Sequence, residues 1–141
     1  MSAAAHTNPE LIEAATAILT EMKDVASSLV YAALLTDDGF DVARLPDDGI
    51  DGARFASMAS SMQALGDAVA HEVRIGTGEY IIIASGKGYV VQLRVPDNHM
   101  VLSGLFDNDA TVGNALAITR STAQKMATLL TAYSGESAAV Q

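Results

Sequence analysis

A glycine-rich segment, Ser85-Gly86-Lys87-Gly88, is the first place where the sequence suggests chemistry, because glycine loops that contain a lysine can cradle phosphate groups. The phosphate-binding motif also requires a glycine five residues before its Gly-Lys pair and a hydroxyl residue after the lysine. Ile81 and Gly88 occupy these two positions here. The segment is therefore better interpreted as a hairpin turn between two strands.

Two further patterns resemble parts of metal sites. His71-Glu72 begins like the helix of a zinc protease, but Ile75 stands where the second histidine is required. Asp107-x-Asp109 begins like a calcium loop, but Val112 replaces its glycine. The sequence therefore predicts no metal ion and no other cofactor, and the aspartates near residue 107 are interpreted as a cap for the helix that follows them.

Carboxylates and imidazoles are the remaining candidates for acid–base catalysis. Six aspartates lie between Asp37 and Asp51, mostly in predicted turns, where carboxylates are usually solvated. The histidines, His6, His71 and His99, are far apart in the sequence, and no nucleophile motif accompanies them. We therefore expect no catalytic residues and no enzymatic activity.

The composition of the chain limits its partners and its location. Its 141 residues suit one domain, and half of them are hydrophobic. Seventeen acidic and eight basic residues give a net charge of −9, which disfavours binding to nucleic acid. There is no cysteine, no basic leader and no apolar run long enough to span a bilayer. These features predict a cytoplasmic protein without membrane insertion.

Hydrophobic periodicity and turn residues divide the chain into three helices and five strands. Asn8 and Pro9 form a typical helix start. We expect a domain over residues 9–133 between flexible ends, 1–8 and 134–141, with an acidic loop at 46–52. The predicted helices cover residues 9–26, 53–74 and 112–133, and the predicted strands cover residues 29–36, 40–45, 79–85, 89–95 and 100–106.

Strands that are neighbours in the sequence usually pair, which predicts one antiparallel sheet. Numbered along the chain, its strands take the order 2-1-5-4-3. The helix at 53–74 covers one face, and the other two helices cover the opposite face. The predicted fold class is therefore α/β, of the α+β type, with the strands at 40–45 and 79–85 at the two edges.

The two predicted edges differ in their protection against further pairing. Asp41 and Arg44 guard one edge, whereas the strand at 79–85 contains no charge within its apolar run. A second copy of the chain, paired antiparallel across a two-fold axis, would cover this run. We therefore predict a homodimer, and expect Ile82→Asp to give monomeric or insoluble protein. The predicted dimer residues are Tyr80, Ile81, Ile82, Ile83 and Ala84.

The helix at 53–74 carries almost no charge before His71, although a helix exposed to solvent usually carries lysine and glutamate. Small residues such as Ala56, Ala59 and Ala64 leave more than one of its faces smooth. Two interpretations remain open at this point. The helix either packs closely within its own domain or presents a surface to another protein.

Several segments together resemble a bacterial Roadblock/dynein light chain family domain, whose fold is profilin-like. The resemblance covers about residues 9–133 and includes the predicted order of helices and strands. The segments that carry it are ALLTDDGFDVA (33–43), MASSMQALGDAVA (58–70), GYVVQLRV (88–95) and DNDATVGNA (107–115).

Members of this family are non-enzymatic dimers that bind small Ras-like GTPases, as the Mgl-type gliding-motility regulators do, or serve as assembly platforms. The resemblance therefore implies a regulator of a small Ras-like GTPase, with a nucleotide-independent scaffold as the alternative. A small-molecule sensor is a third, weaker alternative. The resemblance also places the partner-binding surface on the exposed part of residues 53–70, with Ser57, Met58, Ser61, Met62 and Leu65 as candidates.

Overall fold

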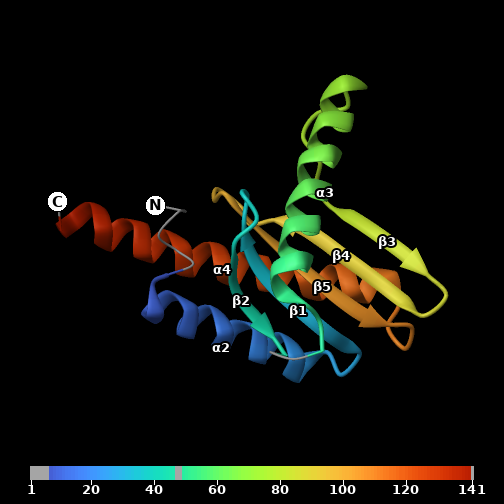
Figure 1. The fold of residues 1–141 in the computed structure, drawn as a ribbon, viewed down its shortest axis with the longest axis horizontal. Helices are drawn as coiled ribbons and strands as arrows, with labels where there is room; N and C mark the ends of the chain where they lie inside the picture. Colours follow the sequence, from blue (N-terminus) through green and yellow to red (C-terminus); the bar gives the residue numbers. More distant parts are fainter. Residues whose placement is uncertain (1–6, 47–48, 141) are drawn as a thin grey trace.

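The computed structural model describes residues 7–46 and 49–140, with side chains as far as Tyr133. It confirms the predicted order of helices and strands (Figure 1). The elements are α2 (Pro9–Val25), β1 (Leu29–Thr36), β2 (Asp41–Leu45), α3 (Gly52–Glu72), β3 (Ile81–Ser85), β4 (Gly88–Arg94), β5 (Met100–Asp107) and α4 (Val112–Val140).

The strands form one antiparallel sheet in the order β2-β1-β5-β4-β3, as predicted. The most apolar strands, β1 and β5, pair at the centre, where Ala33 lies opposite Ser103. The two edges are β2 and β3. On β2, Arg44 and Asp41 form an ion pair with each other, which places charge along that edge.

The helices cover the two faces of the sheet unequally, also as predicted. Helices α2 and α4 pack side by side on one face (Figure 1). Their core contains large side chains such as Leu19, Met22, Leu102 and Phe106. The face under α3 has a smaller core, half of whose buried members are alanine. The fully buried members of this second core are Tyr31, Ala33, Leu35, Ala56, Ala59 and Val101.

Local side-chain hydrogen bonds set the helix starts. The Asn8 side chain accepts hydrogen bonds from the backbone N–H groups of Glu10 and Leu11, which confirms the predicted start of α2. At the start of α4 the prediction was wrong. Thr111 Oγ1 accepts from Asn114 N at 3.1 Å, whereas Asp107 Oδ1 accepts from Asp109 N at 3.0 Å within the preceding turn.

Several boundaries differ from the predicted ones. Helix α3 ends at Glu72, and β3 begins only at Ile81, because Glu79 and Tyr80 contact α4 instead of β4. Helix α4 continues past the predicted domain end to Val140, although Gly135 and two serines in this extension are weak helix formers. The flexibility predicted for the two chain ends stays a prediction. Residues 1–6 and 141, together with Asp47 and Asp48 of the acidic loop, lie outside the described residues.

Candidate interaction surface

The edge strand β3 carries the first half of the candidate surface. Its residues pair with β4 alone within the described chain, from Ile81 opposite Gln92 to Ser85 opposite Gly88. Its outer edge therefore has no strand beside it in residues 7–46 and 49–140. Ala84 is exposed, and Ile83 keeps 47% of its surface exposed. A hydrophobic edge of this kind favours pairing with a further strand.

The three isoleucines of β3 are not equivalent, because successive side chains of a strand point to opposite faces. Ile82 is half-buried and packs against the core formed with α2 and α4. Ile81 points to the other face, where a Cβ built on Gly66 of α3 would lie only 2.8 Å from its Cδ1. The glycine therefore lets α3 approach β3 closely. Ile83 shares the α3 face but is the most exposed of the three.

Helix α3 carries the second half of the surface, an apolar stripe formed by Met58, Met62, Leu65 and Val69. Their spacing of three and four residues places them along one side of the helix. Met58, Leu65 and Val69 are 61%, 66% and 54% exposed, and Met62 is half-buried. Since Gly66 contacts Ile81, this side of α3 lies next to β3. The apolar stripe and the edge strand are thus neighbours.

Ser57 and Ser60 lie on a different flank of α3, the serine flank, and Ser61 lies between this flank and the apolar stripe, because it is three residues after Met58 and four before Leu65. Ser60 and Ser61 donate hydrogen bonds to the Ser57 carbonyl oxygen at 3.1 and 3.0 Å. A Cβ built on Gly39 would lie 3.1 Å from Ser60 Oγ, so this flank faces the turn between β1 and β2. Of the five residues predicted to bind a partner, Met58, Met62 and Leu65 therefore lie in the apolar stripe, Ser57 lies on the serine flank, and Ser61 lies at the border between the two.

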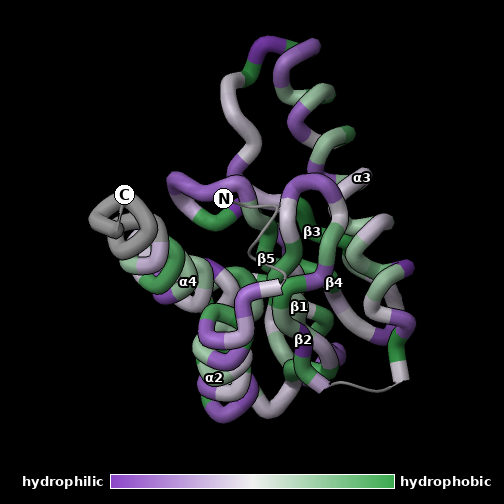
Figure 2. The backbone as a smooth tube through the Cα atoms, turned by 60° about the vertical axis from the view of Figure 1, so that its left-hand side comes forward, coloured by the Kyte–Doolittle hydropathy of each residue, from purple (hydrophilic) through white to green (hydrophobic). Residues whose placement is uncertain are grey.

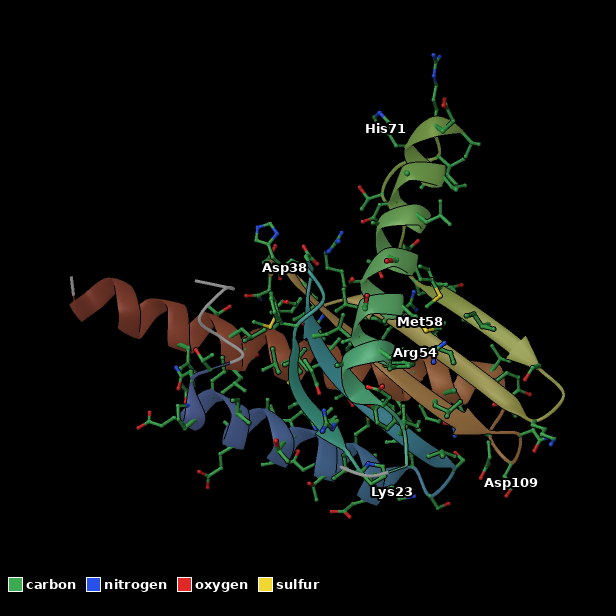
Figure 3. The ribbon with its side chains drawn as sticks, viewed as in Figure 1. Lys23, Asp38, Arg54, Met58, His71 and Asp109 are labelled. Atoms are coloured by element: carbon green, nitrogen blue, oxygen red, sulfur yellow. The ribbon has the colours of Figure 1, made fainter. Side chains whose placement is uncertain are left out.

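The end of α3 and the segment after it, residues 71–80, extend beyond the sheet and are called the arm. His71 lies near its tip (Figure 3). Every residue from 71 to 80 is exposed, and Val73 and Ile75 keep 56% and 76% of their surface exposed. Hydrophobic and hydrophilic residues alternate along the arm (Figure 2). The apolar surface of α3 thus continues past its own sheet.

A polar network fixes α3 over the sheet. Arg94 Nη1 lies 2.8 Å from Asp67 Oδ2 on α3, and Arg94 Nη2 lies 3.3 Å from Asp37 Oδ1 in the β1–β2 turn. The Gln92 side chain, fully buried, donates to the Ala59 carbonyl at 2.9 Å and to Gln63 Oε1 at 3.2 Å. Burial alone would lower the pKa of Arg94, but the hydrogen bond to Asp67 and the charges of both aspartates raise it.

We expect Arg94→Ala to lower the free energy of unfolding by about 1–2 kcal/mol, because Asp37 and Asp67 would lose their shared cation. Urea unfolding at one fixed protein concentration measures the change, which should shrink as salt is added. Lys125→Ala is the matched control, since its ion pair with Glu21 is more exposed. Equal losses in the two variants would contradict a specific role for the network.

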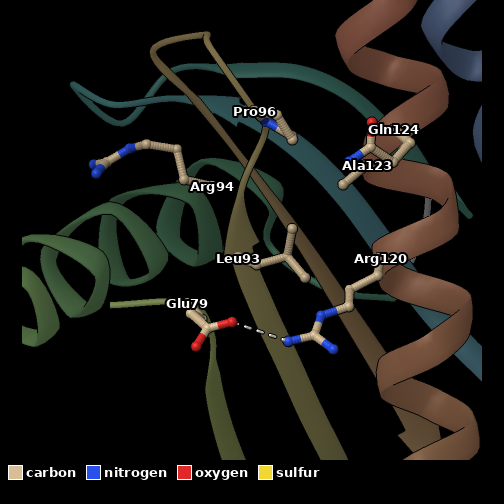
Figure 4. A pocket seen from close by; sticks show the side chains of 7 residues that line it. All are labelled: Glu79, Leu93, Arg94, Pro96, Arg120, Ala123 and Gln124. Atoms are coloured by element: carbon tan, nitrogen blue, oxygen red, sulfur yellow. Dashed lines mark hydrogen bonds and ion pairs between the residues drawn. The ribbon is translucent and has the colours of Figure 1, made fainter. Parts of the chain in front are cut away.

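A small cavity lies between α4 and β4, beside the residues that precede β3. It measures about 240 Å³ and is lined by Glu79, Leu93, Arg94, Pro96, Arg120, Ala123 and Gln124 (Figure 4). Arg120 closes one side by an ion pair with Glu79 at 3.4 Å and by stacking 5.2 Å above the Tyr80 ring. Pockets for small molecules usually enclose about 300–1,000 Å³, so this cavity gives little support to a small-molecule sensor.

The segments considered first for chemistry lie apart in the fold. Gly86 and Lys87 form the turn between β3 and β4, as the hairpin interpretation predicted. His71 is exposed at the far end of α3. Among the described residues no group of three or more histidine, aspartate or glutamate side chains is arranged to hold a metal ion. In the same residues no helix combines the length and hydrophobicity needed to cross a bilayer.

The fold is similar to three kinds of solved structure. MglB from Myxococcus xanthus matches with a TM-score of 0.78 and 14% identity, over 86% of this chain and 90% of that one. A Roadblock/LC7 domain from Streptomyces avermitilis matches with a TM-score of 0.71 and 14% identity, over 84% and 95%. Profilin IB from Acanthamoeba castellanii matches with a TM-score of 0.56 and 16% identity, over 79% and 94%. No protein-family model and no curated protein matches the sequence.

Proposed function

We propose that this chain, which has a Roadblock/LC7 fold resembling Mgl-type proteins, is a non-enzymatic homodimeric regulator that binds a small Ras-like GTPase. The observation that carries the proposal is the continuous apolar surface formed by the exposed edge of β3 and the apolar stripe of α3. Both parts would be costly to leave in water on an isolated copy.

A second copy of the chain can cover the edge of β3 and the apolar stripe of α3 at the same time. Antiparallel pairing of β3 across a two-fold axis perpendicular to the sheet extends the sheet and keeps both α3 helices on the same face. The apolar stripe lies on the side of α3 next to β3, so it would face the partner subunit. Specific interfaces bury about 1,200–2,000 Å² in total, which a strand and a helix from each copy can supply.

The serine flank of α3 would stay exposed in such a dimer, and we propose that the GTPase binds there. Ser57 and Ser60 lie on the flank toward the β1–β2 turn, away from the predicted dimer edge. The surface is built from small polar side chains, the exposed Arg54 lies one turn before Ser57, and Asp37 and Asp38 lie in the adjoining turn. With a net charge of −9, the chain favours a partner with a basic surface.

A pull-down with Ras-like GTPases of the same genome tests this proposal, each loaded with GDP or with a non-hydrolysable GTP analogue. We expect binding that differs at least about tenfold between the two states, since only differential affinity can shift a nucleotide cycle. Ser57→Arg should abolish binding and leave the dimer intact, whereas Thr131→Arg on α4 adds the same charge elsewhere and should bind normally.

Equal binding in both nucleotide states would instead favour the alternative, a nucleotide-independent scaffold that uses the same serine flank. If no Ras-like GTPase binds in either state, the proposed GTPase partner is wrong. The homodimer is a separate part of the proposal, and sedimentation of the purified protein tests it alone.

A further inference from the structure

We propose that two copies pair through β3 in a single register, with the two-fold axis at Ile83, and that Glu79 forms an ion pair with Lys87 of the partner subunit. This inference rests on the proposed homodimer and specifies its geometry. Glu79 precedes β3 in the sequence and Lys87 follows it, and the attraction between these two charges selects the register.

The symmetry of the pairing limits the choice of register. Residues directly opposite each other in an antiparallel pair point to the same face of the sheet. A two-fold axis perpendicular to the sheet must therefore pass through a residue position, not between two residues. The candidates are the five residues of β3, Ile81–Ser85.

The length of the strand favours one candidate. Ile83 is the midpoint of β3, so an axis at Ile83 pairs every residue of the strand with a strand residue of the other copy. Ile81 then lies opposite Ser85, and Ile82 lies opposite Ala84. Moving the axis to either neighbour leaves two residues of each copy beyond the other strand. The two Ile83 side chains, now 47% exposed, would cover each other.

The charges beside the strand favour the same register. Glu79 lies four residues before Ile83 and Lys87 lies four residues after it, so an axis at Ile83 brings these opposite charges together twice. An axis at Ile82 would place Glu79 opposite Ser85 instead. Lys87 is exposed and makes no hydrogen bond or ion pair within the described part of the chain. A long lysine side chain in the hairpin turn is well suited to reach across the pair.

Arg120 acts as a positioning residue for this contact. Its ion pair with Glu79 and its stacking on Tyr80 hold the segment before β3 beside α4. The Glu79 side chain is still 79% exposed, and a carboxylate has enough lone pairs to accept from a second cation. Arg120 therefore holds Glu79 toward the α4 side of the sheet, and the exposed carboxylate must turn toward the strand edge to accept from Lys87 of the partner subunit.

Single cysteines test the register directly, because the chain contains no native cysteine. Opposed residues have Cβ atoms about 4.5–5.5 Å apart, close enough to form a disulfide after a small shift. Under mild oxidation we expect Ile83→Cys to cross-link at least about ten times faster than Ile82→Cys or Ala84→Cys, whose cysteines would be offset by about 7 Å along the strand. Faster cross-linking at either control position would overturn the register.

Mixed charge variants test the ion pair. In this register Glu79→Lys alone and Lys87→Glu alone each oppose like charges in their homodimers, whereas the heterodimer of the two variants restores both pairs. Native mass spectrometry of the mixture should show heterodimer at least about tenfold above its statistical share. Two heterodimers contain the same chains as one homodimer of each variant. The repulsion between Arg120 and the lysine introduced by Glu79→Lys is therefore the same in both and does not change the heterodimer fraction.

The possible outcomes distinguish a failure of the homodimer from a failure of the register and its ion pair. A monomeric wild-type protein would contradict the homodimer and the register together. A wild-type dimer whose variants mix statistically would contradict the ion pair and leave the homodimer standing. A dimer with preferential mixing but without cross-linking at Ile83 would show that the charges meet in a different strand alignment, which also overturns the register.

Discussion

The Ile83→Asp variant is expected to be a folded monomer whose dimer dissociation constant is at least about a thousandfold above that of the wild type. The substitution places one unpaired carboxylate from each copy side by side in the proposed interface, where burying uncompensated charge costs several kcal/mol. Ile83 is 47% exposed in the isolated chain, so the monomer can keep its carboxylate in water. Sedimentation equilibrium over a range of protein concentrations measures the dissociation constant.

Val30→Asp is the matched control for this experiment. Val30 lies on β1 and is also 47% exposed, so the cost of the aspartate within one copy should be similar. It is far from the β3 edge in the strand order, and its variant should dimerise like the wild type. A dimeric Ile83→Asp protein, or a monomeric Val30→Asp protein, would contradict the proposed interface. Circular dichroism on both variants checks that each remains folded.

The choice of Ile83 over Ile82 depends on information that the sequence does not contain. The sequence indicated that the whole run from Tyr80 to Ala84 was apolar and uncharged, and Ile82 is its centre. The structure shows that Ile82 packs against the α4 side of the core, so Ile82→Asp would unfold the domain as well as separate the copies. Alternation along a strand is predictable, but its phase depends on which face receives the larger core.

The sheet itself was predictable because local signals and pairing rules agreed. Short turns such as Asp38-Gly39 and Gly86-Lys87 lie between apolar runs, and the central strands are apolar on both faces. These features set both the strand order and the placement of the helices. The start of β3 was predicted two residues too early, because the contact of Arg120 with Glu79 and Tyr80 joins residues about 40 positions apart.

The candidate surface was predictable only as a list of residues. The composition of α3 indicated a helix with almost no charge, but it did not show that Met58 and Leu65 face β3 whereas Ser57 and Ser60 face the β1–β2 turn. That division follows from two close approaches, Gly66 to Ile81 and Gly39 to Ser60. Each joins segments that are distant in the sequence, so periodicity within the helix could not reveal it.

The same division gives the proposed regulator two separable functions on one helix. Substitutions in the apolar stripe should affect self-association, and substitutions on the serine flank should affect partner binding. The helix rests on small side chains and on the polar network around Arg94. Its position, and therefore both surfaces, depends on the stability of the sheet beneath it.

Phe106→Ala is expected to lower the free energy of unfolding by about 3–5 kcal/mol, a large share of the roughly 5–15 kcal/mol typical of a domain. Phe106 is fully buried on β5, and its ring lies against Gly104, where a Cβ would be 3.1 Å from Cε1. The neighbouring backbone cannot collapse into the space that alanine would leave. Urea unfolding at a protein concentration below the dimer dissociation constant separates this loss from self-association.

Phe40→Ala is the matched control, because it removes the same atoms from the β1–β2 turn, where Phe40 is 48% exposed. It should lower the free energy of unfolding by less than about 1 kcal/mol. Similar losses in the two variants would contradict the placement of the main core between β5 and the helices α2 and α4.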